Sequence, residues 1–390
     1  MKVLFAHDHH FVRQPDGIVV SPGQFDTKIL GRYLEAFDEM TVFSRMTEAG
    51  PDFNGSGHLR CSRDGVEFVA APNLSSLEAL IFGRFEIDRQ LRGLLEKHDA
   101  VIARLPSEIG IAAVRVAQNV KRPTAVEVVG CAFDALKRHS NWQGRLYAPI
   151  AMARMRHAVG MADQVLYVTD RFLQRRYPST APQAAVSNVD IPEPPNSCLE
   201  TRFENIAGAR PLKAGMIANV AHRTKGLDIA LRALRIVRDA DIDMTLEIVG
   251  PGGDHLWRDL IESLDLSKHV VFRGVLPRGA EILAFLDDID IYLQPSFQEG
   301  LPRAVIEAMS RGCPVLGSNA GGTPELLPER FIHRAGDYTI LAEQWLQLAQ
   351  TPQLRSEAAK TNFVAAQRFY ASRLDKVRRQ FWKSFAERIR

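Results

Sequence analysis

The chain has 390 residues, of which 46% are hydrophobic and 24% are charged, the proportions of an ordinary soluble globular protein, and its length predicts two domains. The net charge of +3 gives no indication of a nucleic-acid partner. The four cysteines are scattered without a C-x-x-C pair, which argues against a zinc site and against a disulfide framework and favours a reducing cytoplasm.

The N-terminus, MKVLFAHDHH, contains an apolar run that is too short for the core of a signal peptide. We interpret residues 2–6 as a buried first strand. Elsewhere, charged residues interrupt every apolar stretch before it reaches the length needed to span a bilayer. We therefore expect a cytoplasmic protein, with membrane contact limited to a peripheral association at the inner face of the membrane.

In the first half of the chain, short apolar runs alternate with longer segments of helical periodicity. The apolar runs predict strands at residues 2–6, 40–44, 66–70, 100–104, 124–129 and 164–169. The segments between them predict helices at residues 25–37, 77–97, 109–120 and 146–161. This alternation is typical of a parallel sheet with helices on both faces. We place the first domain at residues 1–195.

The pattern breaks at VDIPEPPNSCLETRFENIAGARPLK (189–213), which contains four prolines and has no sustained periodicity, so we interpret it as the interdomain connection. A second alternation follows over residues 210–372. Its predicted strands are 214–220, 244–250, 270–274, 290–295 and 314–318, and its predicted helices are 226–238, 254–264, 279–286 and 302–311. From residue 338 the chain is predicted to be helical to its end.

The sequence thus predicts an α/β protein with two doubly wound, Rossmann-like parallel-sheet domains. A helix at about 373–390 carries an amphipathic stripe, and we expect it to pack back on the first domain. Ligands of open α/β sheets bind at the carboxyl ends of the strands, so we expect a binding cleft where the two domains face each other.

The segment SFQEGLPRAVIEAMSRGCPVLGSNAGGTPELL (296–327) contains two carboxylates of interest. Glu299 precedes a glycine and a predicted helix N-terminus, where backbone N–H groups favour an anionic ligand and a carboxylate can accept hydrogen bonds from sugar hydroxyls. Glu307 shares one face of the predicted helix with Arg303 and Arg311 at i, i+4 spacing, so a surface ion pair is an alternative explanation for it. Helix geometry leaves both interpretations open.

The same segment resembles the signature of family 4 glycosyltransferases, which are retaining nucleotide-sugar transferases of GT-B fold. The resemblance covers the E-x7-E pair, the Pro-Ser before it, and the E-A-M, G-x-P-V and G-G-x-P-E sequences after the first glutamate. IANVAHRTKGLDIALRAL is similar to the diphosphate-binding loop and helix of this family, and IVGPGG is similar to its glycine turn. The resemblance covers nearly the whole chain and is weakest over residues 45–120.

The resemblance implies a role for several residues. Glu299 would hold hydroxyls of the transferred sugar, and Glu307 would bind the ribose hydroxyls. Gly300 and Leu301 would present backbone N–H groups to the donor. Lys225 would neutralise the diphosphate, in agreement with the Lys-Gly pair that opens a predicted helix.

One position departs from the family pattern. Asn219 stands where the family usually has an arginine, six residues before the lysine, so Arg223 or, less favourably, His222 would supply the second positive charge. Arg273 lies where the base-binding strand of the family ends, although it could be a solvated side chain. Gly23, in SPGQFDTK, resembles the glycine loop that faces the donor phosphates and the acceptor.

Other polar clusters receive structural interpretations. The D-D-I-D sequence at 287–290 could be mistaken for a D-x-D metal site, but it leads directly into a buried strand, as aspartates in turns commonly do. We expect no metal and no cofactor besides the nucleotide sugar as substrate. His7, His9 and His10 are interpreted as polar loop residues after the first strand, with contact to the acceptor as the alternative, and Glu127 near a strand end is treated with the same caution.

Between residues 121 and 176, basic residues outnumber acidic residues by ten to four, which gives a net charge of +6, and aromatic residues are interleaved with them. This region could contact anionic lipid or a lipid-linked diphosphate, or it could be an ordinary solvated face.

The sequence therefore predicts a retaining glycosyltransferase that moves a hexosyl group from a nucleotide-diphosphate sugar to an acceptor hydroxyl. The resemblance suggests an acceptor glycan or lipid-linked sugar in cell-surface polysaccharide or glycolipid assembly. The alternatives are a nucleotide-sugar 2-epimerase of the same fold, which acts on the donor alone, and a non-catalytic nucleotide-sugar-binding protein, which the asparagine at 219 would suit.

Overall fold

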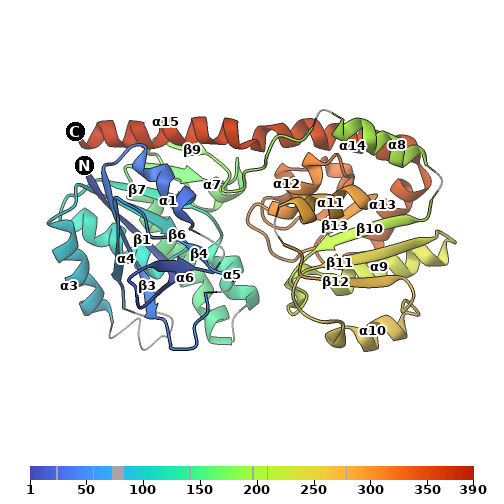
Figure 1. Ribbon diagram of the computed structural model, residues 1–390, viewed down its shortest axis with the longest axis horizontal. Helices are drawn as coiled ribbons and strands as arrows, with labels where there is room; N and C mark the ends of the chain where they lie inside the picture. The colour runs from blue at the N-terminus through green and yellow to red at the C-terminus, as the bar shows by residue number, and fades with distance from the viewer. Residues whose placement is uncertain are drawn as a thin grey trace. The chain divides into compact units, whose positions relative to one another are not determined.

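In the computed structural model, the chain forms two compact units (Figure 1). Unit 1 comprises residues 1–186 and 375–390, and unit 2 comprises residues 187–374. The structure describes residues 1–22, 25–55, 57–72, 83–139, 142–195, 197–208, 210–277 and 279–390.

Unit 1 contains a largely parallel sheet. Its parallel strands run in the order β5-β3-β1-β6-β7-β8-β9. The short strand β2 pairs antiparallel with the carboxyl end of β1, and β4 pairs antiparallel with β2. The strand bounds are β1 Lys2–Arg13, β2 Val19–Ser21, β3 Glu39–Glu48, β4 Leu59–Arg60, β5 Val66–Ala70, β6 Ala100–Leu105, β7 Thr124–Val128, β8 Gln164–Tyr167 and β9 Gln183–Ala185. The central strands are buried on both faces, which is why they appear in the sequence as continuous apolar runs.

Helices cover both faces of this sheet. On one face, α3 (Arg84–Leu95), α4 (Glu108–Asn119) and α6 (Trp142–Gly160) share a core with the strands. On the other face, α1 (Thr27–Leu34) and α15 (Ala371–Ile389) bring Tyr33 and Trp382 together, with ring centroids 5.2 Å apart. Residues 375–390, which include most of α15, thus belong to unit 1. Two further helices of this unit are α5 (Ala132–His139) and α7 (Phe172–Arg176).

Unit 2 contains a second parallel sheet, with the strand order β12-β11-β10-β13-β14-β15. The strand bounds are β10 Leu212–Ile217, β11 Met244–Val249, β12 Val270–Gly274, β13 Ile291–Gln294, β14 Val315–Ser318 and β15 Ile332–His333. The chain builds outward from β10 in one direction through β11 and β12, and then continues on the other side with β13. The order of the strands therefore reverses between β10 and β13, which is the topological switch point at which such sheets bind ligands.

The helices of unit 2 form two groups. On one side, α9 (Leu227–Asp239) packs against α13 (Tyr338–Gln350), and α8 (Cys198–Ala207), α12 (Arg303–Ser310) and α14 (Pro352–Ala366) form a second packed group (Figure 1). The remaining helices are α10 (Arg258–Ser263) and α11 (Ala280–Asp288), with short 3-10 turns at 223–225, 254–256, 323–325, 329–331 and 367–369. The expected α/β fold with two parallel-sheet domains is confirmed.

The structure differs from the sequence analysis at several elements. The first strand continues to Arg13, so His7, His9 and His10 lie within β1 and the expectation that they occupy a loop is wrong. Residues 132–139 form α5 and residues 332–333 form β15, neither of which was predicted. Of the predicted helix 77–97, residues 77–82 lie outside the described residues.

The proline-rich segment 189–213, interpreted as a connection, is part of unit 2 and contains α8. Packing explains the difference, because this segment attaches to unit 2 through contacts that sequence periodicity does not reveal. Ile191 forms a β-bridge with Tyr370. The buried guanidinium of Arg202 donates hydrogen bonds to the carbonyl oxygens of Leu286, Ile289 and Arg311.

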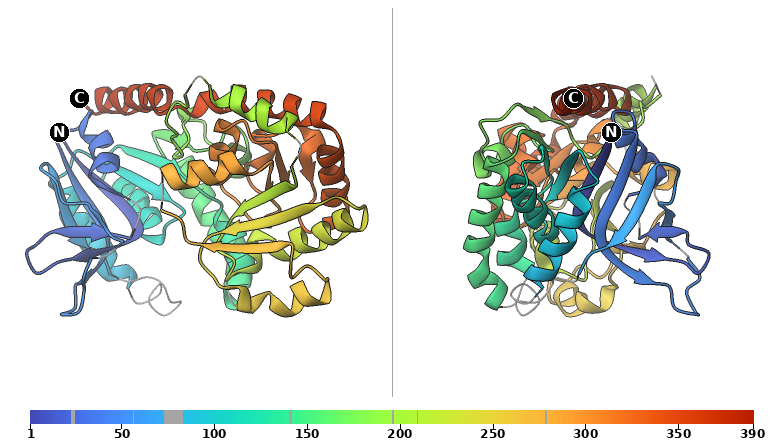
Figure 2. Two further views of the ribbon diagram at one scale, coloured as in Figure 1. Left: turned by 45° about the vertical axis from the view of Figure 1, so that its right-hand side comes forward. Right: turned by 90° about the vertical axis from the view of Figure 1, so that its left-hand side faces the viewer.

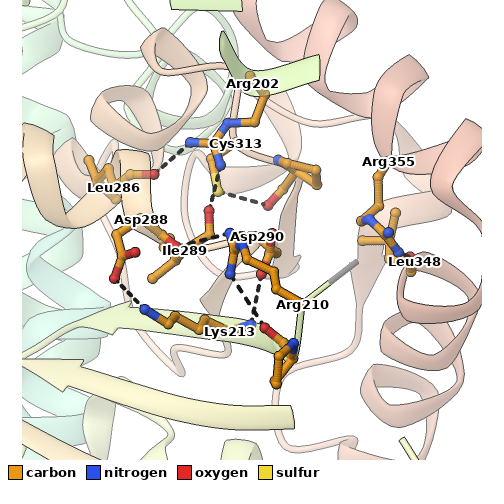
Figure 3. A network of polar contacts seen from close by, with 12 residues as sticks. Arg202, Arg210, Lys213, Leu286, Asp288, Ile289, Asp290, Cys313, Leu348 and Arg355 are labelled. Atoms are coloured by element: carbon orange, nitrogen blue, oxygen red, sulfur yellow. Dashed lines mark hydrogen bonds and ion pairs between the residues drawn. The ribbon is translucent and has the colours of Figure 1, made fainter. Parts of the chain in front are cut away.

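The aspartates of the D-D-I-D sequence take part in a structural network (Figure 3). The buried carboxylate of Asp290 accepts hydrogen bonds from the backbone N–H of Lys213 at 2.8 Å and from Nη2 of Arg210 at 2.9 Å. Asp288 pairs with Nζ of Lys213 at 2.7 Å. These contacts join the end of α11 to the start of β10, in agreement with the interpretation of this sequence as a structural turn.

In the part of the chain that the structure describes, no helix combines the length and the apolar character that crossing a lipid bilayer requires.

Candidate functional site

A cavity of about 540 Å³ lies in unit 2 at the carboxyl ends of β10, β11 and β13. It therefore occupies the switch point of the sheet. Its polar side chains are those of Asp190, Asn219, Lys225, Gln294, Glu299, Arg303 and Glu307. Of the residues predicted from the sequence, Glu299, Glu307 and Lys225 line this one cavity. Arg223, which was predicted with them, is exposed on the adjacent turn.

Glu299 is the most deeply placed charged group of this cavity, with only 8% of its side chain exposed. Its Oε1 atom accepts two hydrogen bonds, one from Nζ of Lys225 at 2.7 Å and one from Nε2 of Gln294 at 2.7 Å. Its Oε2 atom accepts no hydrogen bond from the residues that the structure describes. A carboxylate held in this way has one oxygen fixed by the protein and one available for a hydroxyl group.

Gln294 belongs to a buried polar chain that the sequence analysis missed. The hydroxyl of Tyr292 donates to Oε1 of Gln294 at 2.9 Å, and Nε2 of Gln294 donates to Oγ of Ser296 at 2.9 Å as well as to Glu299. Tyr292, Gln294 and Ser296 are all buried. Because Tyr292 and Gln294 alternate along β13, they point to the same side of the strand, and Ser296 follows just after its end.

The sequence contains a signal for this series of buried, hydrogen-bonded side chains. The buried strand IYLQ contains a tyrosine and a glutamine at alternate positions, where a strand covered on both faces usually carries aliphatic residues. Burial, reinforced by the charges of Glu299 and Glu307, raises the pKa of Tyr292 well above its ordinary value. Tyr292 therefore remains a hydroxyl that donates a hydrogen bond.

Two glycines allow the loops around Glu299 to approach each other. Gly226 has a φ of +72°, and a Cβ atom there would lie 2.1 Å from the carbonyl oxygen of Pro295. Gly321 has a φ of +57°, and its Cβ atom would lie 2.0 Å from the carbonyl oxygen of Glu299. The Lys-Gly and Gly-Gly sequences are therefore needed for backbone contact, since any side chain at these positions would push the loops apart.

Further backbone hydrogen bonds fix the same loops. Phe297 donates its N–H to the carbonyl of Thr224 at 2.8 Å, and Gly322 donates its N–H to the carbonyl of Gly300 at 2.7 Å. The N–H groups of Gly300 and Leu301 donate to none of the described residues. The loop thus presents two backbone donors beside the start of α12, as the resemblance implies, and both favour an anionic or hydroxyl-rich ligand.

The two arginines that share a helix face with Glu307 have different ion-pair partners. Arg303 pairs with Glu307 at 3.6 Å, whereas Arg311 makes a bidentate pair with Asp287 of α11, with both N–O distances 2.7 Å. Glu307 is largely buried at the wall of the cavity. Only one of the two ion pairs considered for Glu307 therefore forms.

Asn219 lines the cavity, but its Oδ1 atom accepts the N–H of Ala221 at 3.0 Å, so the side chain closes a local turn. Arg223 lies in the 3-10 turn before Gly226 and is exposed. Neither Arg223 nor Arg273 is among the described residues that line the cavity.

Arg273 instead makes two hydrogen bonds to Glu247 of β11, at 2.9 and 3.1 Å, and this contact raises the pKa of Arg273. Gly23 lies outside the described residues.

The remaining wall of the cavity is apolar. It is formed at the ends of β11 and β12 and along α11 by Val249, Val275, Leu276, Ile282 and Leu283. One end of the cavity therefore offers charged and amide groups, and the other offers an aliphatic surface suited to a flat ring.

The polar residues at the strand ends of unit 1 form a separate buried cluster. Glu127 is buried and accepts hydrogen bonds from Nη1 of Arg104 and from the hydroxyl of Tyr33, both at 2.9 Å. Burial, together with the nearby positive charge of Arg104, lowers the pKa of His7 to about 3 and that of His9 to about 4. These histidines are therefore neutral, and their ring contacts to Phe25 indicate a role in packing.

Comparison with known proteins was consistent with this arrangement. Residues 211–351 match the family described as glycosyl transferases group 1. Protein CapJ of Staphylococcus aureus is 28% identical over 363 residues, which cover 93% of this chain and 90% of CapJ. The GDP-mannose-dependent alpha-(1-6)-phosphatidylinositol monomannoside mannosyltransferase of Mycolicibacterium smegmatis is 25% identical over 313 residues, which cover 75% of this chain and 77% of that protein.

Among solved structures, Anabaena HepE in complex with UDP matches with a TM-score of 0.64 at 19% identity, covering 97% of this chain and 98% of HepE. This likeness shows the fold, which is GT-B. Together with the match over residues 211–351 and the two relatives that cover most of the chain, it leads to one assignment: the chain is a glycosyltransferase of GT-B fold.

Proposed function

We propose that this glycosyltransferase takes its sugar from a nucleotide-diphosphate donor bound in the cavity of unit 2 and transfers it with retention of anomeric configuration. The observation that carries the proposal is that Glu299, Lys225 and Glu307 line one cavity together with an aliphatic surface. The base of a nucleotide suits the aliphatic end, and the ribose hydroxyls suit Glu307. The Anabaena protein that this fold resembles was solved with UDP, which supports a nucleotide ligand.

In this proposal, Lys225 and the backbone N–H groups near Gly300 stabilise the negative charge that develops on the leaving diphosphate. Donor phosphate oxygens compete with Glu299 for Lys225, because the two side chains are paired at 2.7 Å. Arg223 adds a second positive charge from the adjacent turn. The side chain of Asn219 accepts a hydrogen bond within its own turn, so it lines the cavity without adding a charge.

Glu299 orients the sugar rather than attacking it. Its Oε1 atom already accepts hydrogen bonds from Lys225 and Gln294, which occupy the lone pairs that a nucleophilic attack by this oxygen would need. Its Oε2 atom accepts a hydroxyl hydrogen bond from the transferred sugar. The acceptor hydroxyl then attacks from the face on which the diphosphate leaves, and the leaving phosphate oxygen takes the proton of that hydroxyl. The glycosidic bond to the acceptor thereby forms as the sugar–phosphate bond breaks.

For the acceptor, we propose a glycan or a lipid-linked sugar in the assembly of a cell-surface polysaccharide or glycolipid. The mycobacterial relative is named for a phosphatidylinositol monomannoside, which supports an acceptor sugar on a lipid.

The first experiment is a thermal-shift screen with UDP-, GDP-, ADP- and dTDP-sugars. A donor at a concentration of 100 times its Kd is expected to stabilise the protein by about 2.7 kcal/mol. The absence of stabilisation by any nucleotide sugar would contradict the donor assignment. Conversion of the donor sugar to its epimer without an acceptor would replace the proposal with an epimerase.

The second experiment uses variants with the donor found in the screen. Glu299→Gln and Lys225→Ala are expected to lower the turnover number at least 100-fold, the size of effect seen when one charge-stabilising group is removed. Lys213→Ala is the matched control, because this lysine pairs with Asp288 at the opposite end of β10. Normal turnover by the two cavity variants would refute the proposed roles.

A further inference from the structure

Helix α6 of unit 1 is apolar on two opposite faces. Ala148, Ala151, Met155 and Val159 point into the core, as a helix that covers a sheet requires. The opposite face carries Trp142, Leu146 and Ile150, which are 68%, 68% and 55% exposed. The helix packs beside α5 in unit 1 (Figure 2).

The exposed apolar residues form one line along the helix. Their spacing of i, i+4 and i+8 places them within about 80° of each other around the axis, at 100° per residue. Ala153 lies between them in the same projection and Pro149 lies about 20° beyond Trp142, and both are also exposed. Single exposed apolar residues are common, but a contiguous strip usually marks a contact surface.

The charges on this helix have one sign. The helix contains three arginines and neither aspartate nor glutamate. Arg154 pairs with Glu108 at 2.7 Å, and Nε of the exposed Arg156 donates to the carbonyl oxygen of Arg176 at 2.6 Å. Arg145 is exposed and projects along one edge of the apolar strip. A strip of tryptophan, leucine and isoleucine edged with arginine matches an amphipathic helix that lies in the interface of a membrane.

We propose that the exposed face of α6, formed by Trp142, Leu146, Ile150 and Arg145, docks on the surface of an anionic lipid bilayer. The apolar side chains would insert to the depth of the headgroup boundary, while the arginines contact lipid phosphates. The absence of acidic residues on the helix is the reason to favour an anionic membrane over a second copy of the chain, whose identical face would be repelled by its own arginines.

Trp142 provides a direct reporter of this docking. The chain has four tryptophans, and the other three, Trp257, Trp345 and Trp382, are buried. Vesicles with 30% phosphatidylglycerol in phosphatidylcholine should therefore shift the emission of the full-length protein to the blue, through Trp142 alone. Trp142→Phe should abolish this shift while co-sedimentation with the vesicles persists.

Two further variants test the surface itself. The triple replacement of Trp142, Leu146 and Ile150 by serine is expected to weaken vesicle partitioning about tenfold or more, because it removes the inserted side chains. Arg145→Gln is expected to weaken it about fivefold at low salt and much less at high salt. A control triple replacement by serine uses exposed apolar residues on other helices and turns, Leu256, Val364 and Val377, which are 54%, 57% and 42% exposed.

The result that would overturn the proposal is equal partitioning of the α6 triple variant and the control triple variant. Concentration-dependent dimers that the α6 substitutions abolish, without vesicle binding by the unmodified protein, would equally overturn it in favour of a second copy. Lipid binding is measured without donor or acceptor, so its failure is distinct from a failure of the proposed transfer reaction. The α6 triple variant should retain the thermal shift with the donor, since the donor cavity lies in unit 2.

Discussion

The buried chain Tyr292–Gln294–Glu299 leads to a prediction about Gln294→Leu. Leucine is close to glutamine in volume, so the substitution removes the amide with little change in packing. Nε2 of Gln294 donates to Oε1 of Glu299 at 2.7 Å, and the other donor to that oxygen is Lys225. When the donor diphosphate draws Lys225 away, Gln294 is the remaining partner of Oε1. Loss of the Gln294–Glu299 hydrogen bond should therefore affect the donor complex more than the protein without donor.

The expected fall in kcat/KM follows from the negative charge of the Glu299 carboxylate, which accepts this hydrogen bond. A hydrogen bond to a charged group contributes about 1.5–3 kcal/mol, so kcat/KM should fall about 10- to 150-fold. Gln294→Leu should also lower the free energy of unfolding by about 1–3 kcal/mol, because the buried hydroxyl of Tyr292 loses the oxygen to which it donates.

Ser296→Ala separates the two effects. It removes the other acceptor of the Gln294 amide, at 2.9 Å, but leaves the hydrogen bond to Glu299 in place. This variant should lose about 0.5–1.5 kcal/mol of stability and keep kcat/KM within about threefold of the unmodified enzyme. The assays are urea unfolding and initial rates with the donor found by thermal shift. If both variants lose stability and both keep their rates, Gln294 supports the fold and does not position Glu299.

Two further predictions concern a glycine and a histidine. Gly321→Ala should abolish donor binding, because its Cβ atom would lie 2.0 Å from a backbone oxygen of the Glu299 loop. Gly274→Ala is the control, because Gly274 also has a positive φ, of +70°, but a Cβ atom there would meet no atom within 4 Å. This control should cost only about 1 kcal/mol of stability and leave the donor thermal shift intact. Burial lowers the pKa of His333 to about 4, so the unfolded chain binds the proton more tightly and stability should fall as the pH drops from 6.5 to 4. At pH 5 this cost is about 2 kcal/mol, and His333→Gln should lose correspondingly less stability between pH 7 and pH 5 in urea titrations. An identical pH dependence of the variant would show that His333 is not the group responsible, and donor binding by Gly321→Ala would show that the loop tolerates displacement.

Much of the fold was predictable because its signals are local. Strands buried on both faces are continuous apolar runs, and the helices between them have regular periodicity, so β7 and β14 match their predicted bounds to within one residue. The segment 189–213 was misinterpreted because its attachment to unit 2 depends on the buried Arg202 and on the bridge from Ile191, and neither is a feature of periodicity. The helix bounds at 302–311 were close because Pro302 and Gly312 mark them.

The sequence by itself determined the two-domain α/β architecture, the position of the Glu299 loop after a strand, and the resemblance that led to a glycosyltransferase. These depend on the order and spacing of residues along the chain. Only the tertiary structure decided which side chains meet: that Lys225 and Gln294 share one oxygen of Glu299, that Arg311 pairs with Asp287, and that Arg273 pairs with Glu247. The physical reason is that hydrogen bonds and ion pairs between distant segments depend on distances of about 3 Å, which are set by how the strands and helices pack.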